Sequence, residues 1–163
     1  MAVSVYPYDS KEDTQKMHTD SKDICVYSFN SRGFDEDKKD ILKMISLKNK
    51  SNHPIICNQE NFLLLNNRYK VKQALSNYHV IFKQAVMDST HGRPKNGMFI
   101  AIPLELKEQV IDVSPDHWRL QEVIIETKSR ILVINSYFPT DAKTQNFDIT
   151  ELLTTLEEII DCS

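Results

Sequence analysis

At the centre of the sequence lies Pro54-Ile-Ile-Cys-Asn-Gln-Glu60, a short apolar run that ends in a carboxylate. An earlier run, Ile24-Cys-Val-Tyr-Ser-Phe-Asn30, ends in an amide, and a later one, Arg130-Ile-Leu-Val-Ile-Asn-Ser-Tyr137, ends in a tyrosine. β-Branched and aromatic residues dominate these runs, which predicts strands. In α/β folds, ligands bind beyond the ends of such strands. The three runs therefore predict both a sheet and the edge at which a site would form.

The segment between the first two runs is predicted to be a helix over 35–47. Ile41, Leu42, Met44 and Ile45 give it an apolar stripe, and Asp35 can cap its start. A strand, a helix and a second strand in this order form a unit whose two strands lie parallel in one sheet.

After residue 78 the pattern changes to short strands joined by tight connections. We expect strands at 79–87, 97–103, 107–113, 119–126 and 130–137, and an amphipathic helix at 146–160. The predicted fold class is α/β (α+β), with one mixed β-sheet and flanking helices. Helices can cover one face of that sheet, whereas nothing in the sequence supplies a cover for the other.

Length and composition predict one ordinary globular domain. The chain has 163 residues; we expect residues 1–22 to be a disordered leader and 23–163 to form the domain. No window has the apolar length of a membrane span, and the N-terminus has no signal-peptide core. Its three cysteines show no metal-type spacing. These features predict an intracellular protein, nuclear or cytoplasmic, without a membrane partner.

Charge is distributed unevenly although the net charge is only −3. Six cations and one acid, Asp88, occur between positions 68 and 95; the cations are Arg68, Lys70, Lys72, Lys83, Arg93 and Lys95. A basic segment of this kind can follow a phosphate backbone. It can equally be a solvated surface, because charge spacing alone does not say which face each side chain occupies.

The polar strand ends have both a functional and a structural interpretation. Glu60 can hold a metal, or it can be an exposed acid at a strand end. Asn30 can orient a water or a carboxylate, although asparagine is common where a strand turns. Asn135 and Tyr137 can donate hydrogen bonds to a phosphate oxygen, or they can simply pack at the end of an apolar strand.

The order of these pieces resembles the endonuclease/exonuclease/phosphatase superfamily, and within it the endonuclease domain of non-LTR (LINE-type) retrotransposons. Four stretches carry the resemblance: Tyr27-Ser-Phe-Asn30-Ser-Arg-Gly33, Ile55-Ile-Cys-Asn-Gln-Glu60, Arg93-Pro-Lys-Asn-Gly97 and Ile134-Asn-Ser-Tyr137-Phe-Pro139-Thr-Asp141. Phe29 stands where the family has tryptophan. The resemblance covers about residues 23 to 160 and implies a DNase I-like sandwich.

The resemblance implies a Mg²⁺-dependent hydrolysis of phosphodiesters, with Mn²⁺ as an alternative metal and DNA as the partner. Glu60 would be a metal ligand, and Asn30 would help to place that carboxylate and a metal-bound water. Tyr137 would hydrogen-bond the scissile phosphate. Arg93, Lys95 and Asn135 would contact the nucleic acid.

The family's later motifs, a Gly-Asp-x-Asn strand and a terminal Ser-Asp-His, do not follow Ile160. The resemblance therefore implies an N-terminal half whose activity alone is open. We expect such a half to expose an apolar sheet face, and to be unstable unless a second chain covers it. Two alternatives stay open: a non-catalytic nucleic-acid-binding or protein-interaction fragment, and the phosphatase or phospholipase branch of the same superfamily.

Overall fold

The computed structural model describes residues 3–8, 24–48, 53–87, 92–128 and 130–138, together with Thr154. The predicted helix at 146–160 lies outside this range except for Thr154, which is helical. The strand end Pro139-Thr-Asp141 lies outside it as well.

The first sheet contains the strand–helix–strand unit. Its order is β2-β3-β5-β4, with the bounds β2 Val26–Asn30, β3 Ile55–Gln59, β5 Pro94–Pro103 and β4 Tyr78–Met87. The strands β2 and β3 are parallel, as the sequence predicts, whereas β3–β5 and β4–β5 are antiparallel. This is the expected mixed sheet.

Helices cover one face of this sheet. The helix α1, Glu36–Lys48, begins after Asp35, whose Oδ1 accepts a hydrogen bond from Lys38 N at 3.0 Å as an N-cap. A 3₁₀ turn, η1 at Leu65–Asn67, and a short helix, α2 at Tyr69–Ala74, were not expected from the sequence. Leu42 and Val71 from the helices pack on Ile56 and Phe99 from the sheet. Within the described residues, no helix is long and apolar enough to span a membrane.

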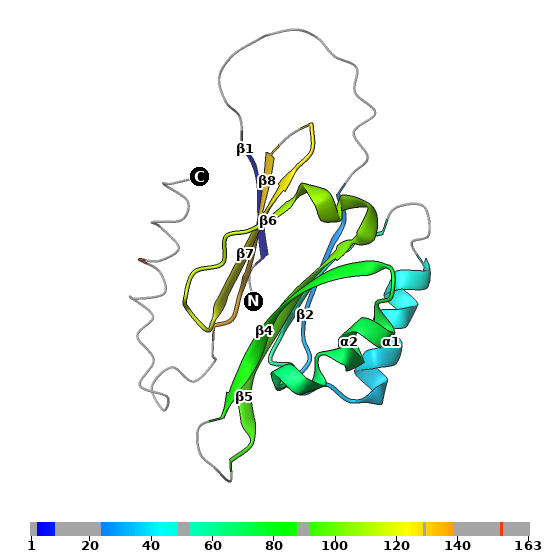
Figure 1. Cartoon of the computed structure of the whole chain (residues 1–163), viewed down its shortest axis with the longest axis vertical. Helices are drawn as coiled ribbons and strands as arrows, with labels where there is room; N and C mark the ends of the chain where they lie inside the picture. Colours follow the sequence, from blue (N-terminus) through cyan, green and yellow to red (C-terminus); the bar gives the residue numbers. More distant parts are fainter. Residues whose placement is uncertain are drawn as a thin grey trace, which may run out of the picture.

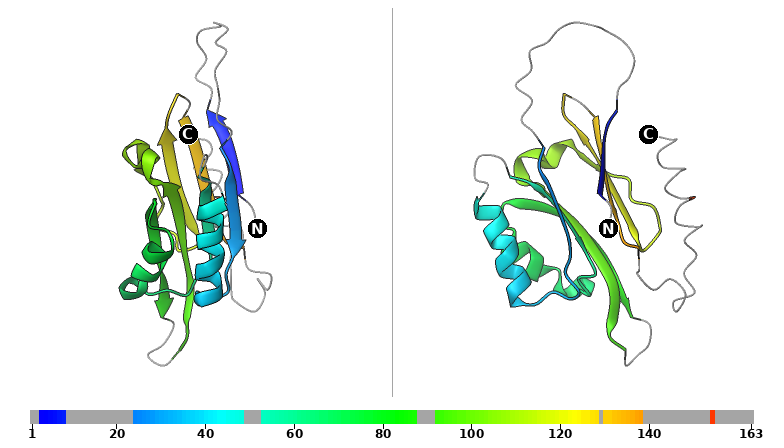
Figure 2. Two further views of the ribbon diagram at one scale, coloured as in Figure 1. Left: turned by 90° about the vertical axis from the view of Figure 1, so that its right-hand side faces the viewer. Right: turned by 180° about the vertical axis from the view of Figure 1, so that it is seen from behind.

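A second sheet covers the other face of the first. It is antiparallel, in the order β1-β8-β7-β6, with the bounds β1 Val3–Tyr8, β8 Arg130–Ser136, β7 Leu120–Glu126 and β6 Val110–Asp112. Ile55 and Ile100 of the first sheet share one buried cluster with Val123 and Val133 of the second. Figures 1 and 2 show α1 and α2 on one side of the first sheet and this second sheet on the other.

This arrangement corrects the expectation of an uncovered sheet face. The later strands were placed with the rest in one sheet, but β6, β7 and β8 separate from it and pack face to face against it. Period-two alternation shows that a strand has two faces, but it does not say which sheet the strand joins. The face that was assigned to a second chain is covered within this one.

Two segments differ locally from the sequence predictions. Val3–Tyr8 lies in the expected disordered leader, yet it pairs with β8 as the edge strand β1, where Val5 stands opposite Val133. Its β-branched and aromatic residues suit a strand, and Pro7 is tolerated at a sheet edge. In addition, a 3₁₀ segment, η2 at Leu104–Gln109, occupies the start of the strand expected at 107–113.

Candidate active site

The first two strands bring an amide and a carboxylate together. Because β2 and β3 are parallel and Asn30 pairs with Gln59, their carboxyl ends lie at one edge of the sheet. Asn30 Nδ2 donates a hydrogen bond to Glu60 Oε2 at 2.6 Å. Its Oδ1 accepts from the backbone N–H of Arg32 at 3.0 Å. The Asn30 side chain is thus fixed at both ends and orients the Glu60 carboxylate.

The backbone around Glu60 is held in an uncommon conformation. Glu60 and Phe62 have φ values of 54° and 57°, in the left-handed region that non-glycine residues seldom adopt. Flanking hydrogen bonds hold the turn: Gly33 N donates to Glu60 O at 2.7 Å, and Asn61 N donates to Gly97 O at 3.1 Å. Such strain persists only where the surroundings over-determine it, and it concentrates at functional sites.

Asn135 joins the two sheets next to this turn. It is fully buried, its Oδ1 accepts from Gln59 Nε2 at 2.5 Å, and its Nδ2 donates to Asn58 O and Phe99 O, each at 3.2 Å. One side chain of β8 therefore bonds to both β3 and β5 of the other sheet. The residue before Glu60 is held by this network.

Tyr137 and Arg119 reach the site from the second sheet. Tyr137 N donates to Arg119 O at 3.1 Å, which extends the β7–β8 ladder by one pair and makes the two side chains cross-strand neighbours. The Tyr137 hydroxyl donates a hydrogen bond to Glu60. Burial, and then this bond, raise the pKa of Tyr137 to about 12, so the hydroxyl keeps its proton at neutral pH.

Arg119 places a positive charge between two aromatic rings. Its guanidinium carbon lies 3.7 Å from the centre of the Trp118 ring and 5.5 Å from that of Tyr137. Burial lowers its pKa to about 10, while Tyr137 and Glu60 act in the opposite direction, so the group stays charged at neutral pH. Because Arg119 is only 2% exposed, it acts as a positioning charge behind Tyr137 and Glu60. The sequence analysis did not identify it.

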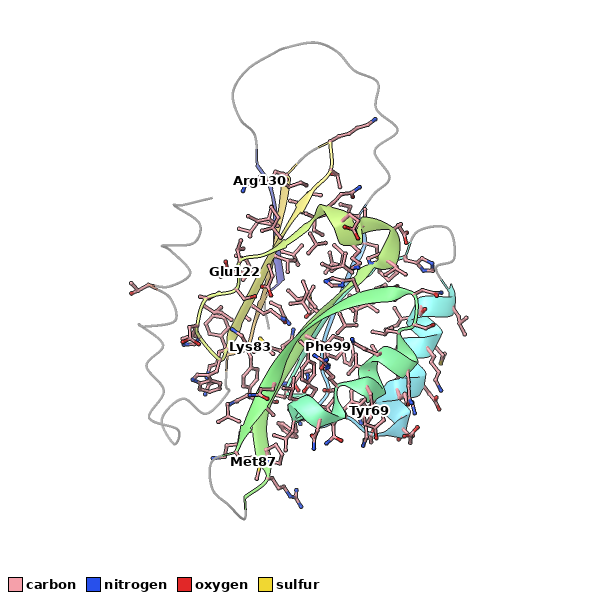
Figure 3. The ribbon with its side chains drawn as sticks, viewed as in Figure 1. Tyr69, Lys83, Met87, Phe99, Glu122 and Arg130 are labelled. Carbon is pink, nitrogen blue, oxygen red and sulfur yellow. The ribbon has the colours of Figure 1, made fainter. Side chains whose placement is uncertain are left out.

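Lys83 fixes the loop that carries Arg119. Its ammonium donates to the carbonyl oxygens of Pro115 and His117, each at 2.8 Å, and of Leu120 at 2.6 Å. Figure 3 labels Lys83 on the side of β4 that faces the second sheet. Like Asn135, it connects the two sheets near the site, whereas the apolar cluster fills the rest of their interface.

The structure separates the six predicted site residues into three groups. Asn30, Glu60 and Tyr137 come together. Asn135 lies beneath them, but it has no exposed surface, so a nucleic-acid contact through its side chain is ruled out in this structure. Arg93 and Lys95 are exposed on the β4–β5 ribbon, away from the hydrogen bonds around Glu60.

The donors around Glu60 fit a partial metal shell. Among the residues that the structure describes, no three His, Cys, Asp or Glu side chains form a metal-binding group, which argues against a closed structural site. Mg²⁺, in contrast, is commonly bound through one or two carboxylates, with water and substrate phosphates as the other ligands. Glu60 can serve in this way, with Asn30 and Tyr137 as its hydrogen-bonding neighbours.

No protein-family model and no curated protein sequence matches this chain. The fold is similar to the crystal structure of an AP endonuclease from Leishmania major, with a TM-score of 0.53 and 13% sequence identity. The match covers 84% of this chain and 46% of the endonuclease, so the chain spans about half of that protein's length. At this identity the likeness shows the fold alone: an α+β arrangement compatible with part of a DNase I-like endonuclease/exonuclease/phosphatase sandwich.

Proposed function

We propose that this chain provides the phosphate- and metal-binding part of a Mg²⁺-dependent phosphodiester hydrolase that acts on DNA. The observation that carries the proposal is the convergence of Asn30, Glu60 and Tyr137 from the ends of three strands. The DNase I-like fold, which the AP endonuclease shares, supports it further.

Each group would have a distinct task in this reaction. Glu60 would hold the cation, which, when bound, neutralises charge that develops on the phosphate oxygens. Asn30 would keep the Glu60 carboxylate in place, as its 2.6 Å hydrogen bond does here. The protonated Tyr137 hydroxyl would donate to a non-bridging phosphate oxygen. The buried charge of Arg119 would keep Tyr137 and Glu60 aligned and favour an anionic substrate.

We also propose that the chain belongs to the retroelement branch of such endonucleases. The support is the strand end Asn135-Ser-Tyr137, where the inner Asn135 ties the sheets together and Tyr137 reaches Glu60. Comparing intact DNA with DNA that contains abasic sites tests this finer proposal. Cleavage of both substrates supports it, whereas cleavage confined to abasic DNA would instead indicate an AP endonuclease.

A second candidate function is nucleic-acid binding without catalysis. One observation favours it, namely that no cluster of three potential metal ligands exists among the described residues. In that case Glu60 would serve the structure of the turn only, and DNA binding would be insensitive to its replacement.

Nicking of supercoiled plasmid distinguishes the two functions. We expect the purified chain to nick plasmid with Mg²⁺ and not with EDTA, and we expect Glu60→Gln to lose this activity. The matched control is Glu108→Gln, because the Glu108 side chain is 90% exposed. Nicking that is equal in wild type and Glu60→Gln would refute the hydrolytic site, as would the absence of nicking from a folded sample that binds DNA.

A further inference from the structure

A shallow hollow lies on the helix side of the first sheet, just beyond the turn that carries Glu60. It has a volume of about 660 Å³ and is lined by Leu64, Leu65, Asn66, Arg68, Tyr69 and Gln84. The lining comes from η1, the start of α2 and the strand β4. Residues 61–64 connect Glu60 directly to this surface, and Leu63 O accepts from Ala85 N of β4 at 2.9 Å.

Apolar side chains are unusually open to solvent here. Leu65 is 53% exposed, Tyr69 is 51% exposed and Val86 is 50% exposed. Val80 and Phe82 of β4 pack with the helices, so by strand alternation Gln84 and Val86 face the same side. The apolar surface therefore continues from the hollow along β4, and Figure 3 labels Tyr69 on this side of the sheet.

The charge of this region has one sign. Between Glu60 and Glu105 the chain has a single acidic residue, Asp88, against six cations. Lys83 is directed to the second sheet, and Lys72 acts electrostatically on His79. Arg68, in contrast, lines the hollow, and Lys95 pairs with Val86 across the ribbon, which places both side chains on one face.

We propose that this surface binds an unpaired stretch of the nucleic-acid strand that passes through the hydrolytic site. An exposed aromatic ring beside cations is the combination by which proteins bind single strands, because bases stack on the ring while cations follow the phosphates. Tyr69 and Leu65 would contact a base and its sugar. Arg68 and Lys95 would contact the neighbouring phosphates. The inference rests on the proposed function for the identity of the ligand.

Nucleic acid fits this surface better than a protein does. A protein partner of a basic surface would have to be acidic, yet nothing in an acidic surface requires the π-face of Tyr69. An unpaired strand uses both features, and the position beside Glu60 gives a single polymer a reason to contact both places.

The test is fluorescence anisotropy of the full chain with a labelled single-stranded oligonucleotide of about 15 nucleotides, the upper range of such sites. EDTA is present, so binding is measured without hydrolysis. We expect Tyr69→Ala to weaken binding about tenfold, as the loss of one stacked base predicts, and Tyr69→Phe to retain it. Arg68→Gln should reduce the slope of log affinity against log salt by about 0.7, one phosphate contact.

Controls at the opposite end of the molecule separate this effect from general damage. Leu104→Ala removes a side chain that is 50% exposed, and Lys107→Gln removes an exposed charge, both in η2. These variants should bind as wild type does. Leu65→Ala provides a second test of the surface, in case Tyr69→Ala is poorly folded by circular dichroism.

Unchanged affinity in Tyr69→Ala and Leu65→Ala would overturn the proposal, and this face would then be examined as a protein-docking surface. Preference for a duplex over the single strand would overturn it as well. The proposed hydrolysis fails separately. Binding that depends on Tyr69 without any nicking refutes hydrolysis alone, whereas Glu60-dependent nicking with binding insensitive to Tyr69 refutes this surface alone.

Discussion

Replacing Asn135 with alanine should weaken the connection between the two sheets and displace the site with it. The substitution removes the amide that bonds to Gln59 Nε2 at 2.5 Å and to the carbonyls of Asn58 and Phe99 at 3.2 Å. Asn135 is completely buried, so water does not replace these bonds without entering the interface. Each buried polar group left without its partner costs about 1–3 kcal/mol.

The expected total is smaller than the sum of these costs. Gln59 Nε2 keeps a second bond to Ser28 Oγ at 3.1 Å, and the two 3.2 Å bonds are long. We therefore expect the free energy of unfolding to fall by about 2–4 kcal/mol, a large share of the 5–15 kcal/mol typical of a domain. Urea unfolding followed by circular dichroism measures this change. Asn77→Ala, at an exposed position, is the control.

Asn135→Asp tests the direction of the hydrogen bonds, because it is nearly isosteric. The aspartate would present an oxygen to the carbonyls of Asn58 and Phe99, which also offer oxygens. Burial raises the pKa of such a carboxyl in the folded state, so its contribution to stability is lost as pH rises. We expect it to be at least as unstable as Asn135→Ala at pH 7 and partly restored at low pH. A loss below about 1 kcal/mol for both variants would refute the network as a structural determinant.

Four further outcomes follow from individual side chains. A Cβ on Gly97 would lie 2.5 Å from Asn61 Oδ1 at a φ of 80°, so Gly97→Ala should lower the free energy of unfolding by about 1–3 kcal/mol, and an unchanged urea midpoint would contradict this. Lys83→Met should cost about 2–3 kcal/mol through its three lost bonds to carbonyls and speed amide exchange in residues 113–119; unaltered exchange would show that Lys83 does not hold the loop. Burial raises the pKa of Glu122 to about 7 from 4.5, against the opposing effect of Lys83. Because the folded pKa is the higher one, stability is lost as pH rises from about 4.5 to 7, and Glu122→Gln should remove about 1–2 kcal/mol of that loss after allowance for solvent screening; a wild-type pH profile in this variant would contradict the assignment. Arg119→Met should reduce plasmid nicking while leaving Leu104→Ala as an unaffected control, and full activity would remove Arg119 from the site.

Much of the site could be predicted from the sequence because it depends on strand ends. Parallel strands place their carboxyl ends at one edge, so Asn30 and Glu60 were expected to meet, and they do. Arg119 could also have been found. The predicted hairpin between 119–126 and 130–137 pairs Glu126 with Arg130, and continuing that register places Arg119 opposite Tyr137.

The division into two sheets could not be predicted in the same way. Alternation identifies the buried face of β7 and β8, but Val123 and Val133 would be equally well buried by a helix or by another sheet. Nor does sequence periodicity reveal that Asn135 points inward, since an asparagine at a strand end usually faces solvent. Its burial follows from the carbonyls of β3 and β5, which only the assembled sandwich brings within reach.

Binding of Mn²⁺ to the full chain, followed by the electron paramagnetic resonance signal of the free ion, tests the central claim most directly. The claim is that the Glu60 carboxylate, oriented by Asn30 and Tyr137, holds a divalent cation. We predict that wild type and Glu108→Gln remove Mn²⁺ from solution and release it to excess Mg²⁺, and that Glu60→Gln, although folded, does not bind it. Equal binding by wild type and Glu60→Gln would contradict the account.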